Sequence, residues 1–175
     1  MKYDLFGQQT ERLIFRKLNE SDFEECLEFF LDPRSNRYWK SDTTNATALA
    51  HQWFDKQLWR YENNKGAINI LINRETELIV GWCGLIVQSV DGKEELEVAY
   101  SIIPIYWNCG YATEAAKRCI DFAIENRLSD SIISIIHVDN AESEKVAIKN
   151  GLKVEKRTTY HGNSVNIFRK NLYYE

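Results

Sequence analysis

The stretch "YWNCGYATEA", Tyr106 to Ala115, interrupts a strand-like pattern with one glycine and leads directly into an apolar helical pattern. A strand that ends in such a turn leaves the first N–H groups of the helix unpaired, at the positive end of its dipole. Gly110 and Ala112 are small, and Asn108 tolerates the left-handed region. A phosphate or pyrophosphate can therefore approach the backbone of residues 109–113. A glycine needed only for the turn is the alternative.

Length and composition predict one globular domain, residues 1–175. The length falls within the roughly 100 to 200 residues of a usual domain. Hydrophobic residues make up 44% of the chain and charged residues 27%, as is typical of soluble proteins. No run approaches the ~18 apolar residues of a membrane helix, and the first residues lack the apolar core of a signal peptide. We therefore expect a cytoplasmic protein with no membrane partner.

Charge and cysteine usage exclude several classes of site. The net charge is −4 and no block of lysine or arginine is present, which argues against nucleic acid as a partner. No C-x-x-C pair occurs among the four cysteines, Cys26, Cys83, Cys109 and Cys119. No Cys/His ligand spacing or triad involves the histidines, His51, His137 and His161. A disulfide framework, a zinc site and any other metal site are not expected.

Hydrophobic periodicity predicts the element order β α α β β β α β α β β. Strands are expected at 12–18, 67–73, 78–87, 95–103 and 131–138 and on both sides of 161–164, and helices at about 23–33, 45–62, 112–126 and 141–150. A capping box at Ser21 to Glu24 should begin the first helix. The three middle strands suit an antiparallel meander, and the later strand-helix-strand run requires a parallel pair. We predict an α/β (mixed α+β) fold with a mostly antiparallel, twisted sheet flanked by helices.

The longer stretch "YWNCGYATEAAKRCIDFA" resembles the coenzyme A loop of the GNAT acetyltransferase superfamily, whose pattern Gln/Arg-x-x-Gly-x-Gly/Ala corresponds to residues 107–112. It is most similar to the branch of ribosomal-protein N-terminal (Rim-type) acetyltransferases. "TERLIFRKL" at 10–18 and "NAESEKVAIKNGLK" at 140–153 resemble further segments of that branch, in the same order. Asn108 replaces the branch's usual glycine and Cys109 a frequent basic residue. We expect the loss of that charge to weaken phosphate binding without abolishing it, because backbone amides carry the interaction.

The resemblance implies a single GNAT-like domain, with a parallel strand pair splayed at the cofactor site and acetyl-CoA as cosubstrate. Pantetheine would bond to the backbone of the strand before the loop, at Tyr100, Ser101, Ile102 and Ile103. The phosphates would meet the loop residues, Trp107, Asn108, Cys109, Gly110, Tyr111, Ala112 and Thr113. Asn140 and Ser143 would contact the coenzyme from the next helix, although both also suit a helix cap.

Acetyl transfer to an amine needs a neutral amine, a stabilised oxyanion and a proton for the leaving thiolate. By the resemblance, Glu97 is the candidate general base, and Glu95 shares its strand face as a weaker candidate near the turn. A carboxylate on a solvated face is the alternative. Ser143 is the candidate hydrogen-bond donor to the coenzyme sulfur. An acceptor groove would be lined by aromatic residues that otherwise suit the core, Tyr38, Trp39, Trp53 and Trp59.

These features predict an acetyl-CoA-dependent N-acetyltransferase that works through a direct ternary complex. The branch favours a protein or peptide N-terminus as the amine acceptor. Two alternatives stay open, namely a small-molecule amine such as an antibiotic or polyamine, and a non-catalytic sensor that only binds coenzyme A. The sequence is compatible with a monomer or a homodimer.

Overall fold

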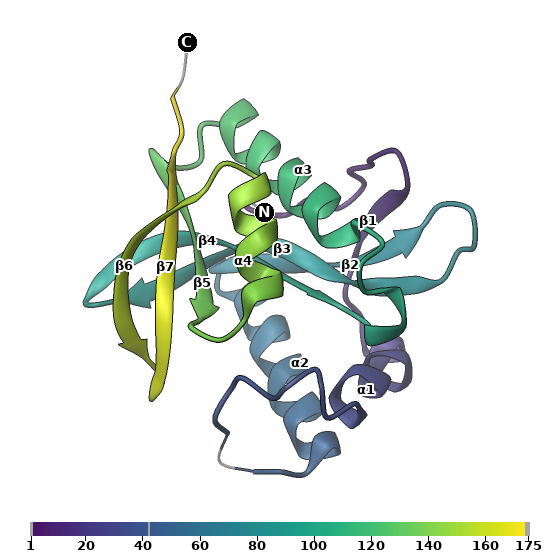
Figure 1. Cartoon of the computed structure of the whole chain (residues 1–175). Helices are drawn as coiled ribbons and strands as arrows, with labels where there is room; N and C mark the ends of the chain where they lie inside the picture. The colour runs from purple at the N-terminus through teal and green to yellow at the C-terminus, as the bar shows by residue number, and fades with distance from the viewer. Residues whose placement is uncertain (1, 42, 174–175) are drawn as a thin grey trace.

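The computed structural model describes residues 2–41 and 43–173, and the predicted order of elements is confirmed (Figure 1). The strands are β1 (Leu13–Lys17), β2 (Gly66–Asn73), β3 (Ile79–Val90), β4 (Lys93–Ile102), β5 (Ser131–His137), β6 (Lys153–Tyr160) and β7 (Asn163–Asn171). The helices are α1 (Phe23–Leu31), α2 (Ala46–Glu62), α3 (Tyr111–Glu125) and α4 (Ala141–Lys149). Short 3-10 turns precede α1 (Glu20–Asp22) and α3 (Pro104–Tyr106). None of the described helices combines the length and apolar character needed to cross a bilayer.

The strands form one mixed sheet in the order β1-β2-β3-β4-β5-β7-β6. All neighbours are antiparallel except β4 and β5, which confirms the predicted parallel pair. That pair is short, because β4 and β5 are in register only at Glu97 and Ile133. Past this point the strands diverge, and the edge of β4 that faces β5 has no strand partner. Backbone groups left this way need another partner, which makes the gap a natural place for a ligand.

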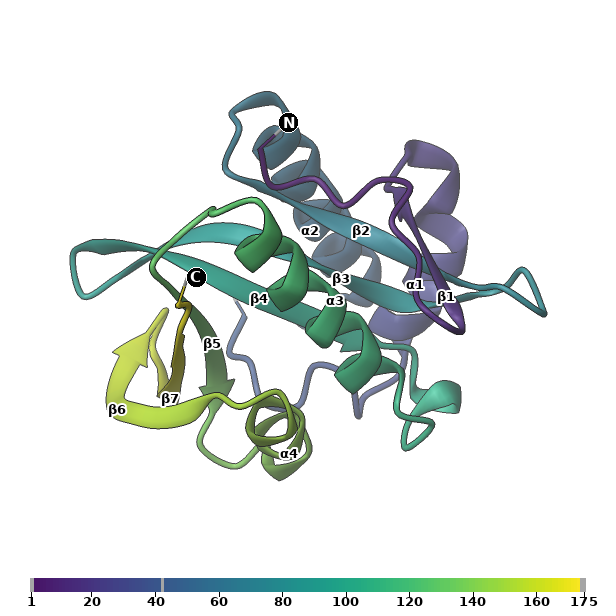
Figure 2. The ribbon, with the colours of Figure 1, turned by 90° about the horizontal axis from the view of Figure 1, so that it is seen from above.

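Two apolar layers cover the two faces of the sheet (Figures 1 and 2). On one face, α3 packs its stripe of small and branched residues against side chains such as Phe15 and Leu85. On the other face, α1 and α2 pack aromatic residues such as Phe29 and Trp53 around Trp82. The gap between β4 and β5 is therefore reached by α3 and α4 from one side and by α2 from the other.

The start of the first helix differs from the prediction. The capping box lies at the 3-10 turn before α1, where the Asn19 side chain accepts a hydrogen bond from the Ser21 backbone N–H at 3.0 Å, and α1 itself has no side-chain cap. The Asp22 carboxylate completes the box by accepting from the Asn19 N–H at 2.9 Å. The same carboxylate pairs with Arg16 at 2.6 Å, an ion pair that a box beginning at Ser21 would not include. The Arg16–Asp22 pair therefore joins the 3-10 turn to β1.

Gly81 should be intolerant of a side chain, because β3 and β4 approach closely there. A Cβ atom at Gly81 would lie 2.3 Å from the Ser101 carbonyl oxygen and 2.8 Å from the Ile102 Cα, and its φ is +154°. We expect Gly81→Ala to destabilise the fold by more than about 2 kcal/mol. Gly92→Ala is the matched control, since Gly92 has a φ of +78° but open space around it, and should cost only about 1 kcal/mol.

Thermal unfolding distinguishes the two variants. The control should lower Tm by roughly 2–4 °C and Gly81→Ala by at least about twice as much. Equal shifts in Tm would show that the close approach of the two strands is not a constraint.

Candidate functional site

A cavity of about 780 Å³ occupies the divergence between β4 and β5. Its walls come from the ends of both strands, the first turns of α3 and α4, and the face of α2 that is turned toward the sheet. Residues 34–40, between α1 and α2, and the turn between β6 and β7 complete it. The cavity thus connects the two sides of the sheet through its one parallel seam.

The glycine loop, residues 107–110, forms one end of this cavity. Asn108 and Gly110 both have positive φ, 62° and 83°, and α3 begins immediately afterwards at Tyr111. No side chain caps α3, so the backbone N–H groups of Tyr111, Ala112 and Thr113 stay available at the positive end of the helix. The loop therefore has the geometry of an anion site.

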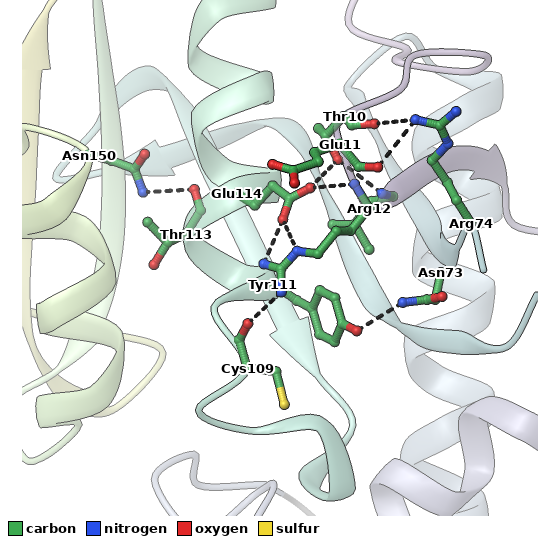
Figure 3. Close-up of polar contacts among 11 residues, drawn as sticks. Thr10, Glu11, Arg12, Asn73, Arg74, Cys109, Tyr111, Thr113, Glu114 and Asn150 are labelled. Atoms are coloured by element: carbon green, nitrogen blue, oxygen red, sulfur yellow. Dashed lines mark hydrogen bonds and ion pairs between the residues drawn. The ribbon is translucent and has the colours of Figure 1, made fainter. Parts of the chain in front are cut away.

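A carboxylate in the first turn of α3 holds this loop from outside the cavity. Glu114 accepts hydrogen bonds from the Thr10 hydroxyl at 2.5 Å and the Arg12 backbone N–H at 2.9 Å, and pairs with the Arg12 guanidinium at 2.6 Å (Figure 3). Arg12 also donates to the Cys109 carbonyl at 2.9 Å and lies over the Tyr111 ring. We call these contacts of Thr10, Arg12 and Glu114 the loop clamp. Partial burial opposes ionisation, but the bonds from Thr10 and Arg12 lower the pKa of Glu114 below its usual value.

Two further contacts fix the loop and helix start. The Asn73 side-chain amide donates to the Tyr111 hydroxyl at 2.8 Å, and the Asn150 amide donates to the Thr113 carbonyl at 3.3 Å (Figure 3). Chain segments far apart in sequence therefore hold the loop in one conformation. This network was not predicted, because neither partner strand nor helix carries a local motif for it.

Glu97 lies in the wall of the cavity and is buried, with 6% of its surface exposed. One carboxyl oxygen accepts from the Gln88 side-chain amide at 2.9 Å and the other from the Ile135 N–H at 3.3 Å. Burial raises the pKa of Glu97 to about 7, although these two donors oppose the shift. The alternative of a solvated carboxylate is therefore wrong for Glu97. Glu95 is not exposed either, because Arg169 pairs with it at 2.9 Å.

An arginine on α2 orients the amide that contacts Glu97. Arg60 donates to the Gln88 side-chain oxygen at 2.9 Å, so the Gln88 NH₂ group must face Glu97. The Arg60 Nη1 group also donates to the carbonyls of Lys65 and Val87, and the described residues give Arg60 no carboxylate within ion-pair distance. Sequence reasoning missed Arg60 and Gln88. One signal was present, since Arg60 follows Trp53 by seven residues on the apolar face of its helix.

Ser143 at the start of α4 and Tyr100 of β4 meet at the cavity. Asn140 caps the helix by accepting from the Ser143 backbone N–H at 3.1 Å, so the Ser143 side chain is not the cap. The Tyr100 hydroxyl donates to the Ser143 carbonyl at 2.9 Å, across the gap between β4 and α4. Burial raises the pKa of Tyr100 well above its usual value. The Tyr100 side chain is a second group that sequence reasoning did not assign.

Most of the predicted site residues line the cavity. They are Glu97, Tyr100, Ser101, Ile102, Trp107, Asn108, Gly110, Tyr111, Ala112, Thr113, Asn140 and Ser143. Two predicted residues do not. Ile103 packs into the apolar layer beside α1 and α2, and Cys109 is exposed on the outer side of the loop with its carbonyl bonded to Arg12.

The predicted aromatic groove is formed only in part. Tyr38, Trp39 and Trp53 line the cavity, whereas Trp59 lies outside it and is 51% exposed. Within residues 2–41 and 43–173, no group of three or more histidine, cysteine, aspartate or glutamate side chains is arranged to hold a metal ion.

The chain matches a protein-family model, and it is similar to known proteins in both sequence and structure. The family model described as an acetyltransferase (GNAT) domain matches residues 12–153. The uncharacterized protein YkkB of Bacillus subtilis (strain 168) is 26% identical over 168 residues, which are 94% of this chain and 95% of that protein. An acetyltransferase from Agrobacterium tumefaciens is 22% identical with a TM-score of 0.78, over 94% of this chain and 93% of that one.

The ribosomal L7/L12 alpha-N-protein acetyltransferase RimL, solved in complex with coenzyme A, also shares the fold. It is 12% identical with a TM-score of 0.75, over 95% of this chain and 97% of that one. At this level of identity the likeness concerns the fold alone.

The buried Glu97 should give stability an unusual pH dependence. Its pKa rises from 4.5 in the unfolded chain to about 7 in the folded protein, so the folded state binds the proton more tightly between these values. The free energy of unfolding should therefore fall as pH rises through this range, by about 3 kcal/mol in total. Urea unfolding across this range should show the slope in the native protein and not in Glu97→Gln.

Glu95→Gln is the matched control, because Arg169 lowers the pKa of Glu95 rather than raising it. That variant should keep the downward slope of stability between pH 4.5 and about 7 that Glu97 causes. A slope that survives in Glu97→Gln would contradict the burial of an ionising carboxyl at this position.

Proposed function

The chain belongs to the GNAT acetyltransferase family and is an N-acetyltransferase that uses acetyl-CoA, and from this premise we propose that it acetylates the N-terminal amine of a protein or peptide in a direct ternary complex, with a cytoplasmic location. The observation that carries the proposal is the buried Glu97 carboxyl in the cavity wall, with its pKa near 7. Amines are mostly protonated at neutral pH, so attack on a thioester requires a base of this strength beside the acceptor. Glu97 is that base.

The open backbone of the cavity suits the coenzyme. The uncapped N–H groups of residues 111–113 would hold the pyrophosphate, and the unpaired edge of β4 would receive the pantetheine as an added strand. Lys149 lines the same end of the cavity and supplies positive charge that Cys109 does not, whereas Lys145 is paired with Glu142 at 3.0 Å. Acetyl-CoA brings to this site a thioester that an amine can attack without a covalent enzyme intermediate.

Proton transfer in this proposal uses two groups on opposite sides of the gap. Glu97 accepts the proton of the incoming amine, and its second oxygen stays oriented by the Ile135 N–H. Ser143 lines the cavity at the start of α4 and donates a hydrogen bond to the leaving sulfur. The contact between the Tyr100 hydroxyl and the Ser143 carbonyl makes Tyr100 a positioning residue for that turn.

The coenzyme assignment is tested by thermal shift with acetyl-CoA, coenzyme A and ATP. At ~100 times Kd a ligand stabilises by about 2.7 kcal/mol, or roughly 5–10 °C for a domain of this size. Both coenzyme forms should raise Tm and ATP should not. Arg12→Met should weaken the coenzyme shift because the loop clamp is lost, whereas Arg74→Met, which removes bonds only to Thr10 and Glu11, should not. No shift with either coenzyme form would overturn the assignment.

The base assignment is tested by the kinetics of thiol release with an N-terminal peptide amine. Glu97→Gln should lower kcat by at least about 100-fold while the coenzyme shift in Tm persists. In the native protein kcat/KM should rise with pH through an apparent pKa near 7. Gln88→Met removes a hydrogen-bond donor that lowers the pKa of Glu97. In this variant the rise of kcat/KM with pH should therefore occur at higher pH than in the native protein.

Unchanged turnover in Glu97→Gln would sink the base assignment. Coenzyme binding without thiol release for any amine would instead support the non-catalytic sensor.

A further inference from the structure

We infer that the cavity accepts an amine that carries a carboxylate or phosphate group close to its nitrogen, an inference that rests on the proposed function. It concerns the acceptor end, the part of the cavity on the α2 side of the sheet. The residues that define this end are Arg37, Lys40, Lys56, Gln57, Arg60 and His161. The protein has a net charge of −4, so a basic cavity wall is not a reflection of its overall composition.

The wall formed by residues 37–40 is held in place by specific contacts. The Lys40 backbone N–H donates to the buried Asn163 side chain at 2.9 Å, and Asn163 in turn donates to the His161 carbonyl at 2.9 Å. Tyr38 stacks on His137 at the end of β5, with ring centroids 5.5 Å apart. Arg37 lies over the Tyr38 ring at 4.6 Å and donates to the Tyr38 hydroxyl. This segment therefore presents its cations at a defined place.

The cations of the acceptor end lack acidic partners among the described residues. Arg37, Lys56 and Arg60 form no ion pair there, and Glu97 is the carboxyl in the same wall. Arg34 is different, because Asp32 pairs with it at 2.6 Å. Unpaired cations that line one cavity attract an anion and disfavour a second cation. A polyamine acceptor would meet like charges here.

The coenzyme does not account for this charge. Its anion site lies at the other end, where the start of α3 and the lysines Lys145 and Lys149 of α4 line the cavity. The acceptor-end cations come from α2 and residues 37–40, on the opposite face of the sheet from α3 and α4 (Figures 1 and 2). A second negatively charged group, one that belongs to the acceptor, is the ligand that matches them.

Buried polar atoms at the same place also lack partners. Gln57 is 5% exposed and lines the cavity, and its side-chain oxygen makes no hydrogen bond within the described residues. The Nε–H of the buried Arg60 has no partner there either. Buried polar groups in proteins are almost always paired, so unpaired ones in a cavity wall mark a polar ligand. Gln57 suits the amine or an amide of the acceptor, and the cations suit its anionic group.

The test compares matched acceptors that differ only in charge. The peptides Ser-Asp-Glu-Glu and Ser-Asn-Gln-Gln share one N-terminal amine, and alanine and alaninamide form a small-molecule pair that differs in the carboxylate beside the amine. Spermidine serves as the cationic probe. Each is titrated calorimetrically into the coenzyme A complex of the full chain at low and at high salt, and each is assayed for thiol release with acetyl-CoA.

We expect the acidic member of at least one pair to bind at least about tenfold more tightly than its amide, with an advantage that shrinks at high salt. The pair that shows the preference distinguishes a peptide from a small acceptor. The double variant Arg37→Gln/Lys56→Gln should reduce the preference to about twofold or less. Lys153→Gln is the control for charge, because Lys153 is exposed on β6 outside the cavity and should leave the preference intact.

The outcomes separate this inference from the proposed function. Equal binding of acid and amide, binding of neither, or tighter binding of spermidine would overturn the anionic acceptor even if thiol is released. Anion-selective binding that depends on Arg37 and Lys56, without thiol release from any amine, would support the anion site and overturn the transferase proposal.

Discussion

The site depends on a single constraint, the parallel contact between β4 and β5. Each strand is fully engaged on its other side, β4 by β3 and β5 by β7, and both of those pairings are antiparallel and extended. The sheet therefore consists of two complete antiparallel halves joined at Glu97 and Ile133. Because neither strand can turn toward the other without breaking its own ladder, the seam opens. The ends of both strands, the start of two helices and the buried carboxyl all meet at this opening.

The electrostatics of Glu97 follow from its place at the seam. A carboxyl buried without donors would stay protonated at neutral pH, and one in direct contact with an arginine would be too weak a base. Here the Gln88 side chain lies between Arg60 and Glu97. It accepts a hydrogen bond from Arg60 and donates one to Glu97, so the guanidinium orients the amide without contacting the carboxyl itself. The Ile135 N–H belongs to β5, so this second donor also depends on the parallel contact. The pairing of β4 with β5 therefore contributes to the pKa of Glu97.

Features set by neighbouring residues could be predicted from the sequence, and features set by distant ones could not. Periodicity gave the order of elements and the parallel pair, and strand alternation placed Glu97 opposite the apolar side chains. The loop clamp joins Arg12 to Glu114, and the contacts of Glu97 with Gln88 and of Gln88 with Arg60 join α2, β3 and β4, so no local pattern contains either set. The predicted helix cap was wrong for a local reason, because a 3-10 turn capped by Asn19 precedes α1 and its Asp22 pairs with Arg16 of β1.

The departures of the loop from its family's pattern change how the loop is held. Asn108 takes the left-handed conformation that a glycine would adopt at less cost, with a φ of 62°. Cys109 contributes no charge, and the Arg12 charge behind the loop is neutralised by Glu114. The clamp therefore contributes rigidity, while positive charge comes from Lys149 of α4 and from the dipole of α3. Since backbone amides that are already oriented lose little entropy on binding, a rigid loop compensates for the missing basic side chain.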